Sequence, residues 1–152
     1  MRRPGLAVCL AAILLAAPAC AGGDDDNGGG EAGGGDEKVI RLVIPDNNIR
    51  VEGAECAGAR PFEYLHASAP YTLESAGGEV LVEGELPAGH AENAEPGTDW
   101  GVDEIPTVCV MRLAFDDVPE SETYVLRLPE GDPLEFEGRY LTAGEPLQLI
   151  VE

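Results

Sequence analysis

The stretch TVCVMRLAF, residues 107 to 115, decides the fold that the sequence predicts. Four of its apolar side chains fall on one face of an extended chain: Cys109, Met111, Leu113 and Phe115. Arg112 and Ala114 fall on the other face. This alternation is typical of a β-strand with one side against a core.

Short stretches of the same kind continue on both sides of it, at residues 38–44, 49–53, 71–75, 79–86, 123–128, 134–138 and 147–152. PDNN (45–48) predicts a turn, and AGG (76–78) predicts a hairpin. Residues 62–69 could form one helical turn at most. We therefore expect an all-β fold over residues 39–152, a single antiparallel β-sandwich of about seven or eight strands, immunoglobulin-like or transthyretin-like.

The cysteines divide into three groups by position. Cys9 lies in an apolar N-terminal run, Cys20 directly follows that run, and Cys56 and Cys109 lie among the predicted strands. An even pair in an exported domain predicts a disulfide. A Cys56–Cys109 disulfide would close a loop of over 50 residues. Closing such a loop stabilises a fold by roughly 4 kcal/mol in the chain-entropy model. A redox role is not indicated, because the pair lacks C-x-x-C spacing.

The segment RLAFDDVPESETYVLRLPEG (112–131) resembles transthyretin-like and Cna-B-type sandwiches. More broadly, residues 54–138 resemble small exported domains of high-GC Gram-positive bacteria, with GGEVLVEGELPAG between two cysteines and VP…YVLRL after the second. Such domains are often lipoproteins without an assigned activity. The resemblance implies a fold and a location, and it implies no reaction.

The N-terminal region reads as an export signal. Arg2 and Arg3 precede the apolar run GLAVCLAAILLAA (5–17), and small residues lead to Cys20. This layout resembles bacterial lipoproteins, in which the cysteine is acylated and becomes the mature N-terminus. We expect residues 1–19 to be a signal peptide and Cys20 to be lipidated. The alternative is an A-x-A cleavage site at Ala17-Pro18-Ala19, which would release a secreted soluble protein.

Residues 20–38 then form the expected tether. Residues 21–37 contain eight glycines and seven Asp, Glu or Asn residues, with no apolar side chain larger than alanine. Such a segment cannot bury enough surface to offset its ordering entropy, so we expect a flexible linker. Seventeen residues of Gly-rich coil span roughly 20–25 Å.

Charge excludes one class of partner. The chain carries a formal net charge of −20, and residues 39–152 carry 6 basic and 23 acidic residues. A field of this sign repels nucleic acid phosphates, so we expect no nucleic acid partner. The same field favours a cationic or envelope-polymer partner, and we expect the domain to be a monomer.

Residues 87–106, PAGHAENAEPGTDWGVDEIP, lack strand signals and are long for a connection. This segment contains the only tryptophan, Trp100, beside Asp99, Asp103 and Glu104. We expect these four residues to form a binding loop with an aromatic anchor and an acidic surround. The alternative is a loop whose tryptophan folds back over the end of the sandwich.

The sequence contains few patterns that indicate a metal site or a catalytic site. Calcium is the alternative that acid-rich stretches leave open, at Asp46-Asn47-Asn48, at Asp99, Asp103 and Glu104, and at Asp116-Asp117, although none has EF-hand spacing. A copper site would need a different arrangement of His66, His90, Cys109 and Met111. There is no G-x-S-x-G or comparable nucleophile context. We therefore expect no cofactor and no enzyme activity.

The resulting hypothesis is a lipid-anchored, extracytoplasmic domain on the outer face of the cell membrane. It would act as a non-catalytic binding or structural module. The alternative is a secreted acidic domain, with calcium binding open.

Overall fold

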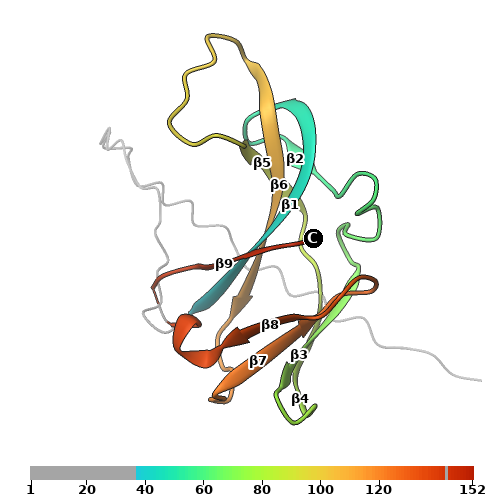
Figure 1. Ribbon diagram of the computed structural model, residues 1–152, viewed down its shortest axis with the longest axis vertical. Coiled ribbons are helices and arrows are strands. Elements are labelled where there is room, and N and C mark those ends of the chain that lie inside the picture. The colour runs from blue at the N-terminus through green and yellow to red at the C-terminus, as the bar shows by residue number, and fades with distance from the viewer. Residues whose placement is uncertain (1–36, 143) are drawn as a thin grey trace, which may run out of the picture. The chain divides into compact units, whose positions relative to one another are not determined.

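The computed structural model describes residues 37–142 and 144–152, and these form an all-β domain with two sheets (Figure 1). The expected signal peptide, Cys20 and nearly all of the tether lie outside the described residues. One short 3₁₀ turn, η1 (Gly138–Tyr140), is the helical element of this part of the chain. Within it, no helix has the length and apolar character needed to span a membrane.

The first sheet has five strands in the order β2-β5-β6-β1-β9. Their bounds are β1 (Lys38–Val51), β2 (Glu55–Cys56), β5 (Gly89–Asn93), β6 (Glu104–Phe115) and β9 (Leu147–Ile150). The second sheet has the order β4-β3-β7-β8. Its strands are β3 (Pro70–Ser75), β4 (Val80–Glu85), β7 (Thr123–Arg127) and β8 (Leu134–Glu137).

Both sheets contribute to one hydrophobic core. The β6 residues that alternate toward one face are buried as expected: Cys109, Met111, Leu113 and Phe115. Leu73 on β3 and Leu126 on β7 are fully buried in the same cluster, and Phe136 on β8 joins them. The hairpin predicted through AGG is confirmed as the antiparallel pair β3–β4.

The turn predicted at PDNN is wrong. β1 runs through it as one strand of 14 residues, with a bulge between Ile44 and Asn48 where its pairing with β6 shifts. Asn47 absorbs the extra length with a positive φ of 51°. The Asp46 carboxylate accepts hydrogen bonds from Asn48 (2.9 Å) and Arg50 (3.1 Å), which ties the bulge to the strand beyond it.

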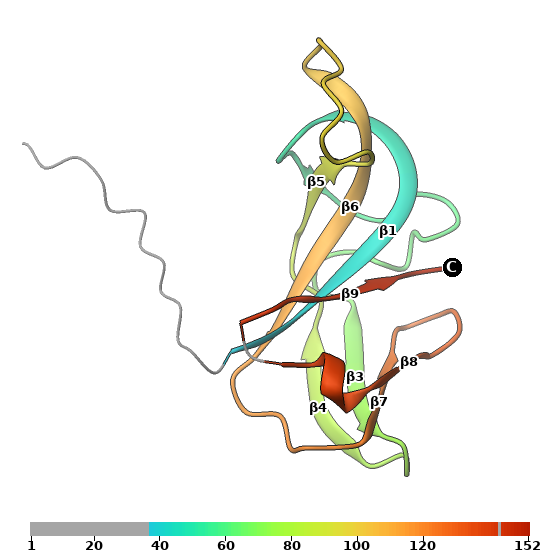
Figure 2. The same ribbon diagram turned by 60° about the vertical axis from the view of Figure 1, so that its left-hand side comes forward.

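One pairing departs from the antiparallel arrangement that was expected. β9 lies parallel to β1, with Ile40 opposite Leu147 and Val43 opposite Ile150 (Figure 2). Sequence patterning cannot distinguish the two directions, because a strand alternates in the same way in either one. The remaining pairings are antiparallel.

The connection from β6 to β7 carries the chain from one sheet to the other, and Tyr124 fixes it. The Tyr124 hydroxyl donates to the Pro119 carbonyl at 2.8 Å and accepts from the Ser121 amide at 3.2 Å. Its ring is buried and stacks against Phe136 at 5.6 Å between centroids. The Tyr124 side chain therefore links the hydrophobic core to the backbone of the β6–β7 connection.

Candidate functional site

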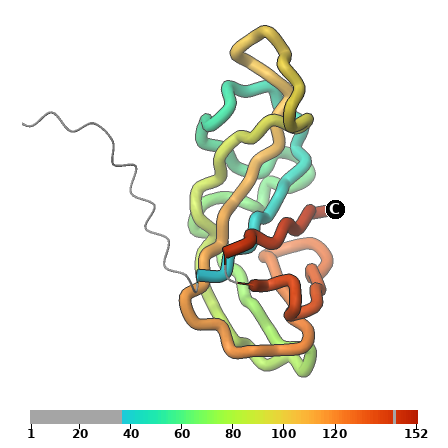
Figure 3. Tube along the Cα trace, turned by 90° about the vertical axis from the view of Figure 1, so that its left-hand side faces the viewer, coloured from blue at the N-terminus to red at the C-terminus, as the bar shows by residue number. Residues whose placement is uncertain are grey.

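The binding loop expected over residues 87–106 is shorter than the sequence suggested. β5 (Gly89–Asn93) pairs with β6, and the loop proper comprises residues 94–103 at the end of this hairpin (Figure 3). The sequence GHAEN lacks the β-branched and aromatic residues that mark strands. It is extended because its backbone pairs with β2 on one side and β6 on the other, a long-range effect that local propensity does not contain.

Gly89 shows why this strand begins with a glycine. The Cys56–Cys109 disulfide, predicted from the sequence, is present. A Cβ on Gly89 would lie 2.5 Å from the Cys109 sulfur and 2.9 Å from the Cys56 carbonyl. Glycine therefore allows β5 to pass directly over the bridge.

Asn93 organises the loop. Its side-chain oxygen accepts hydrogen bonds from the Glu95 amide (2.9 Å) and from the Trp100 indole nitrogen (3.1 Å). Its amide nitrogen donates to the Thr98 carbonyl at 3.3 Å. Trp100 is consequently held at its polar edge and is only partly buried. The indole has a fixed position and retains an accessible surface.

The three acidic residues predicted with Trp100 lie at the same end of the five-stranded sheet. Asp99, Asp103 and Glu104 are exposed. The Asp99 carboxylate accepts a hydrogen bond from the Gly101 amide at 3.0 Å and so shapes the turn beside the indole. Glu104 begins β6, opposite Val51 of β1. The structure thus brings the loop together with the end of β1.

Sequence reasoning missed the apolar residues that share this end. Val102 is 65% exposed, Ile49 is 61% exposed and Val51 is 51% exposed. Ile49 lies opposite Pro106 and Val51 opposite Glu104, so their side chains share one sheet face. We call Ile49, Val51, Trp100 and Val102 the apolar tip. The alternation in IRVEG could have indicated it, had the strand's outward face been considered.

Charge surrounds the apolar tip with one sign. The exposed acids nearest to it in the sequence and strand register are Glu52, Glu95, Asp99, Asp103 and Glu104. Arg50 is the basic residue on this part of β1, and its guanidinium pairs with Asp46 and contacts the Thr107 hydroxyl. The Asp46 side chain is fully buried in this pair. The positive charge of Arg50 is therefore paired with Asp46, and the exposed charged residues around the apolar tip are anionic.

The same ion pair bears on calcium. Both carboxylate oxygens of Asp46 already accept hydrogen bonds from Arg50 and Asn48, so this segment offers no free carboxylate for a cation. No group of three or more His, Cys, Asp or Glu side chains is placed to hold a metal within residues 37–142 and 144–152. Cys109 cannot supply a thiolate for copper, because it is bonded to Cys56.

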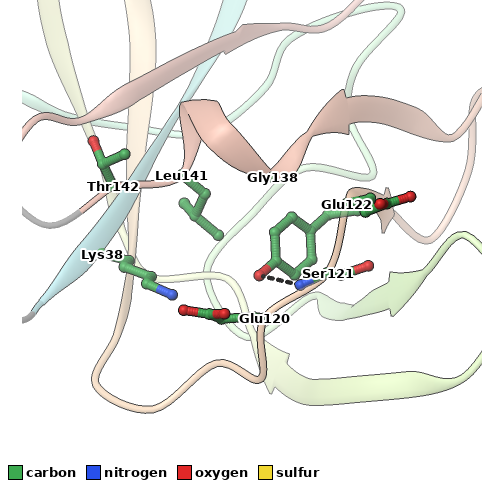
Figure 4. Close-up of a pocket in the computed structure, with 8 residues that line it drawn as sticks. Lys38, Glu120, Ser121, Glu122, Gly138, Leu141 and Thr142 are labelled. Atoms are coloured by element: carbon green, nitrogen blue, oxygen red, sulfur yellow. Dashed lines mark hydrogen bonds between the residues drawn. The ribbon is translucent and has the colours of Figure 1, made fainter.

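A separate hollow of about 540 Å³ lies beside the Tyr124 crossing (Figure 4). Lys38, Glu120, Ser121 and Thr142 contribute polar groups to its lining. Figure 4 shows the Lys38 amine and the Glu120 carboxylate facing one another. The Ser121 hydroxyl donates to the Thr123 carbonyl at 2.6 Å, so it is engaged in the turn. The lining contains no histidine or cysteine, and we see no nucleophile paired with a base in it.

Two tyrosines have perturbed acidity, and neither belongs to the apolar tip. Burial raises the pKa of Tyr71, whose ring packs edge-on against Phe115 at 6.2 Å. Burial also raises the pKa of Tyr64, and the nearby Glu130 carboxylate adds to the effect. Both groups therefore favour the neutral phenol at ordinary pH.

No family model, curated protein or solved structure matches the chain. The candidate site therefore rests on the chain's own residues. Within the described part, the apolar tip groups exposed apolar side chains and a hydrogen-bonded tryptophan at one end of the five-stranded sheet. Ile49 and Val51 lie on the outward face of this end, whereas Trp100 is held by Asn93, which shares the other face with Thr107.

Proposed function

We propose that the chain is a membrane-anchored extracytoplasmic lipoprotein that acts as a non-catalytic binding module. Its fold would be a β-sandwich of the immunoglobulin-like or transthyretin-like kind. Two sheets with a common core and a tyrosine bonded back to the crossing backbone support that assignment. An acylated Cys20 and the tether would keep the domain at a high local concentration near the membrane.

The observation that carries the binding role is the apolar tip with its acidic surround. Exposed aromatic and aliphatic side chains supply contact area, and a partner's cationic groups would meet the carboxylates. The fixed indole reduces the ordering cost of binding, because hydrogen bonding to Asn93 already restricts its rotamers. The partner class that fits is a cationic or amine-bearing polymer of the envelope.

Trp100 provides the test of the binding role, since it is the only tryptophan in the chain. Mature protein carrying Cys20→Ser would be titrated with oligolysine and with oligomeric glucosamine while indole fluorescence is recorded. We expect a saturable change that Asp103→Asn with Glu104→Gln weakens. Asp116→Asn with Asp117→Asn changes the net charge equally at an exposed loop elsewhere and is the matched control. Equal weakening by both pairs would reduce the interaction to general charge attraction.

The anchor is tested separately, by mass spectrometry of the chain expressed in a Gram-positive host. A mature N-terminus at Cys20 with a diacylglyceryl mass in the membrane fraction would support the lipoprotein. An unmodified N-terminus in the medium would support the secreted alternative, through cleavage after Ala17-Pro18-Ala19. Millimolar calcium that raises the melting temperature, reversed by chelator, would support the calcium alternative.

A further inference from the structure

The outer edge of β4 is distinct from the apolar tip. β4 is the outermost strand of the four-stranded sheet and pairs with β3 on one side only. The other strands that end a sheet are shorter: β2 has 2 residues, and β8 and β9 have 4 each, against 6 in β4. Among the four strands that end a sheet in the described part, β4 therefore presents the longest unpaired edge.

The surface along this edge is hollowed. A groove of about 570 Å³ is lined by four consecutive β4 residues, Val80, Leu81, Val82 and Glu83. It coincides with the shift in the β3–β4 register, where Leu81 is the extra residue between the pairs Leu73–Val82 and Glu74–Val80. Val80 is 46% exposed there. The edge thus combines a regular stretch toward Glu85 with a shallow hollow at its start.

Charge along the edge has one sign. Glu79, Glu83 and Glu85 are exposed, and residues 70–85 contain no lysine or arginine. The nearest basic residue in the sheet is Arg127 on β7, and its guanidinium donates to Glu74 at 2.8 Å. Glu83 and Glu85 lie opposite Thr72 and Pro70, so they project from one face of the sheet with two-residue spacing.

The opposite face of β4 is the face toward the core, and Val82 and Tyr71 are partly buried against that core. Val82 and Gly84 alternate with the glutamates, and the Tyr71 ring lies over Gly84, where a Cβ would be 2.7 Å from its hydroxyl. A strand added beside β4 would therefore meet carboxylates on one face and Val82, Tyr71 and the hollow on the other.

We propose that the β4 edge binds an extended cationic segment of another protein by strand addition, with lysine or arginine alternating with apolar residues. Main-chain hydrogen bonds would supply affinity, and the hollow and the glutamates would supply specificity. Cross-strand pairs of opposite charge would form at Glu83 and Glu85. A second copy of this chain does not fit, because its own β4 would place glutamate opposite glutamate.

The probe is fluorescein-labelled acetyl-Lys-Val-Lys-Val-Lys-Val-amide, titrated with full mature protein carrying Cys20→Ser. Its control is the same peptide with every backbone amide N-methylated, which keeps charge and side chains but removes the donors of a strand. Binding would be read by anisotropy, and hydrogen exchange would locate it. We expect saturable binding that the N-methylated peptide loses, with slowed hydrogen exchange in residues 80–85.

Matched double variants test whether the peptide pairs with β4 at Glu83 and Glu85. Glu83→Gln with Glu85→Gln should weaken binding about 2- to 30-fold, from two cross-strand charge pairs. Glu135→Gln with Glu137→Gln removes the same charge from β8, the other edge of the same sheet, and should have little effect. The proposal is overturned by equal binding of the N-methylated peptide, by equal loss in both double variants, or by protein self-association through β4. A change confined to Trp100 fluorescence would assign the peptide to the apolar tip instead and also overturn it.

Discussion

The two ends of the five-stranded sheet are built from the same two strands, yet the inward face of β1 is apolar at one end and polar at the other. In the first half of β1, Ile40, Leu42 and Ile44 face the core and are fully buried. Beyond the bulge, Asn48 and Arg50 occupy that face, opposite Thr107 and Ile105 of β6. The apolar residues Ile49 and Val51 lie on the outward face.

The first half of β1 therefore contributes to stability, whereas the half beyond the bulge is available for recognition. Where both sheets contribute, burial of apolar area favours the folded state. At the tip, Arg50 and Thr107 are hydrogen-bonded on the inward face beside the buried Ile105, and Ile49 and Val51 leave apolar area exposed on the outward face. Exposed apolar residues add little to folding and are available to a partner. The bulge at residues 45–47 marks the boundary between the two regimes.

The largest effect is expected from the disulfide, which lies between the two regimes. Replacing Cys56 and Cys109 together by serine should lower the free energy of unfolding by about 4 kcal/mol, since a constraint on the unfolded chain is lost. Guanidinium denaturation followed by circular dichroism measures it. Cys20→Ser, outside the described residues, is the control and should change nothing. An unaltered midpoint in the double variant would show that packing alone holds β2 and β5.

The next effect contrasts the core with the apolar tip directly. Leu126→Ala should cost about 3 kcal/mol, because the side chain is fully buried and its removal leaves a cavity. Val102→Ala should change stability by less than about 0.5 kcal/mol, because the side chain is mostly exposed. Both are measured by denaturant unfolding. Similar losses from the two variants would contradict the division between stability and recognition.

A smaller effect on the free energy of unfolding is expected at the bulge of β1. Asp46→Asn should cost about 2 kcal/mol, since the buried partner of the Arg50 guanidinium loses its charge. Asp103→Asn, at an exposed position, is the control and should be neutral within error. If Asp46→Asn were also neutral, the bulge would be held by the backbone and by Asn47 rather than by the ion pair.

The smallest effect is a pH dependence. The pKa of Tyr71 is raised above its ordinary value of 10.0 in the folded state, while the unfolded chain keeps that value. The folded state therefore holds its proton longer, and stability is complete below about pH 10 and falls as pH rises further. Tyr71→Phe should reduce the slope of unfolding free energy between about pH 9 and 11. An unchanged slope would assign the loss to Tyr64 or to general charge repulsion.

Local alternation in the sequence predicted much of the fold. The inward face of β6, the β3–β4 hairpin and the Cys56–Cys109 pair follow from period-two patterning and cysteine number, and the structure confirms them. β5 was missed because its extended form depends on neighbours distant in the sequence. The bulge was read as a turn because PDNN has turn composition, and the distant Thr107 that completes its hydrogen bonding is not visible locally.

The candidate site was predictable only in part. Trp100 and its neighbouring acids stood out by composition, but nothing local placed Ile49 and Val51 at the same end of the sheet, with Val51 opposite Glu104. Their proximity results from the β1–β6 register, which the shift at the bulge sets. Register depends on pairing between segments more than 50 residues apart, and a single sequence carries no direct signal for it.

The parallel pairing of β9 with β1 has a consequence for the order in which the chain appears during synthesis. Ile40 meets Leu147, so the first described strand finds its last neighbour 107 residues later. Until those residues leave the ribosome or any pore that threads the chain, one edge of β1 stays open. Contacts of such long range also slow the search for the native state. The five-stranded sheet is therefore completed only after residues 147–150 have emerged.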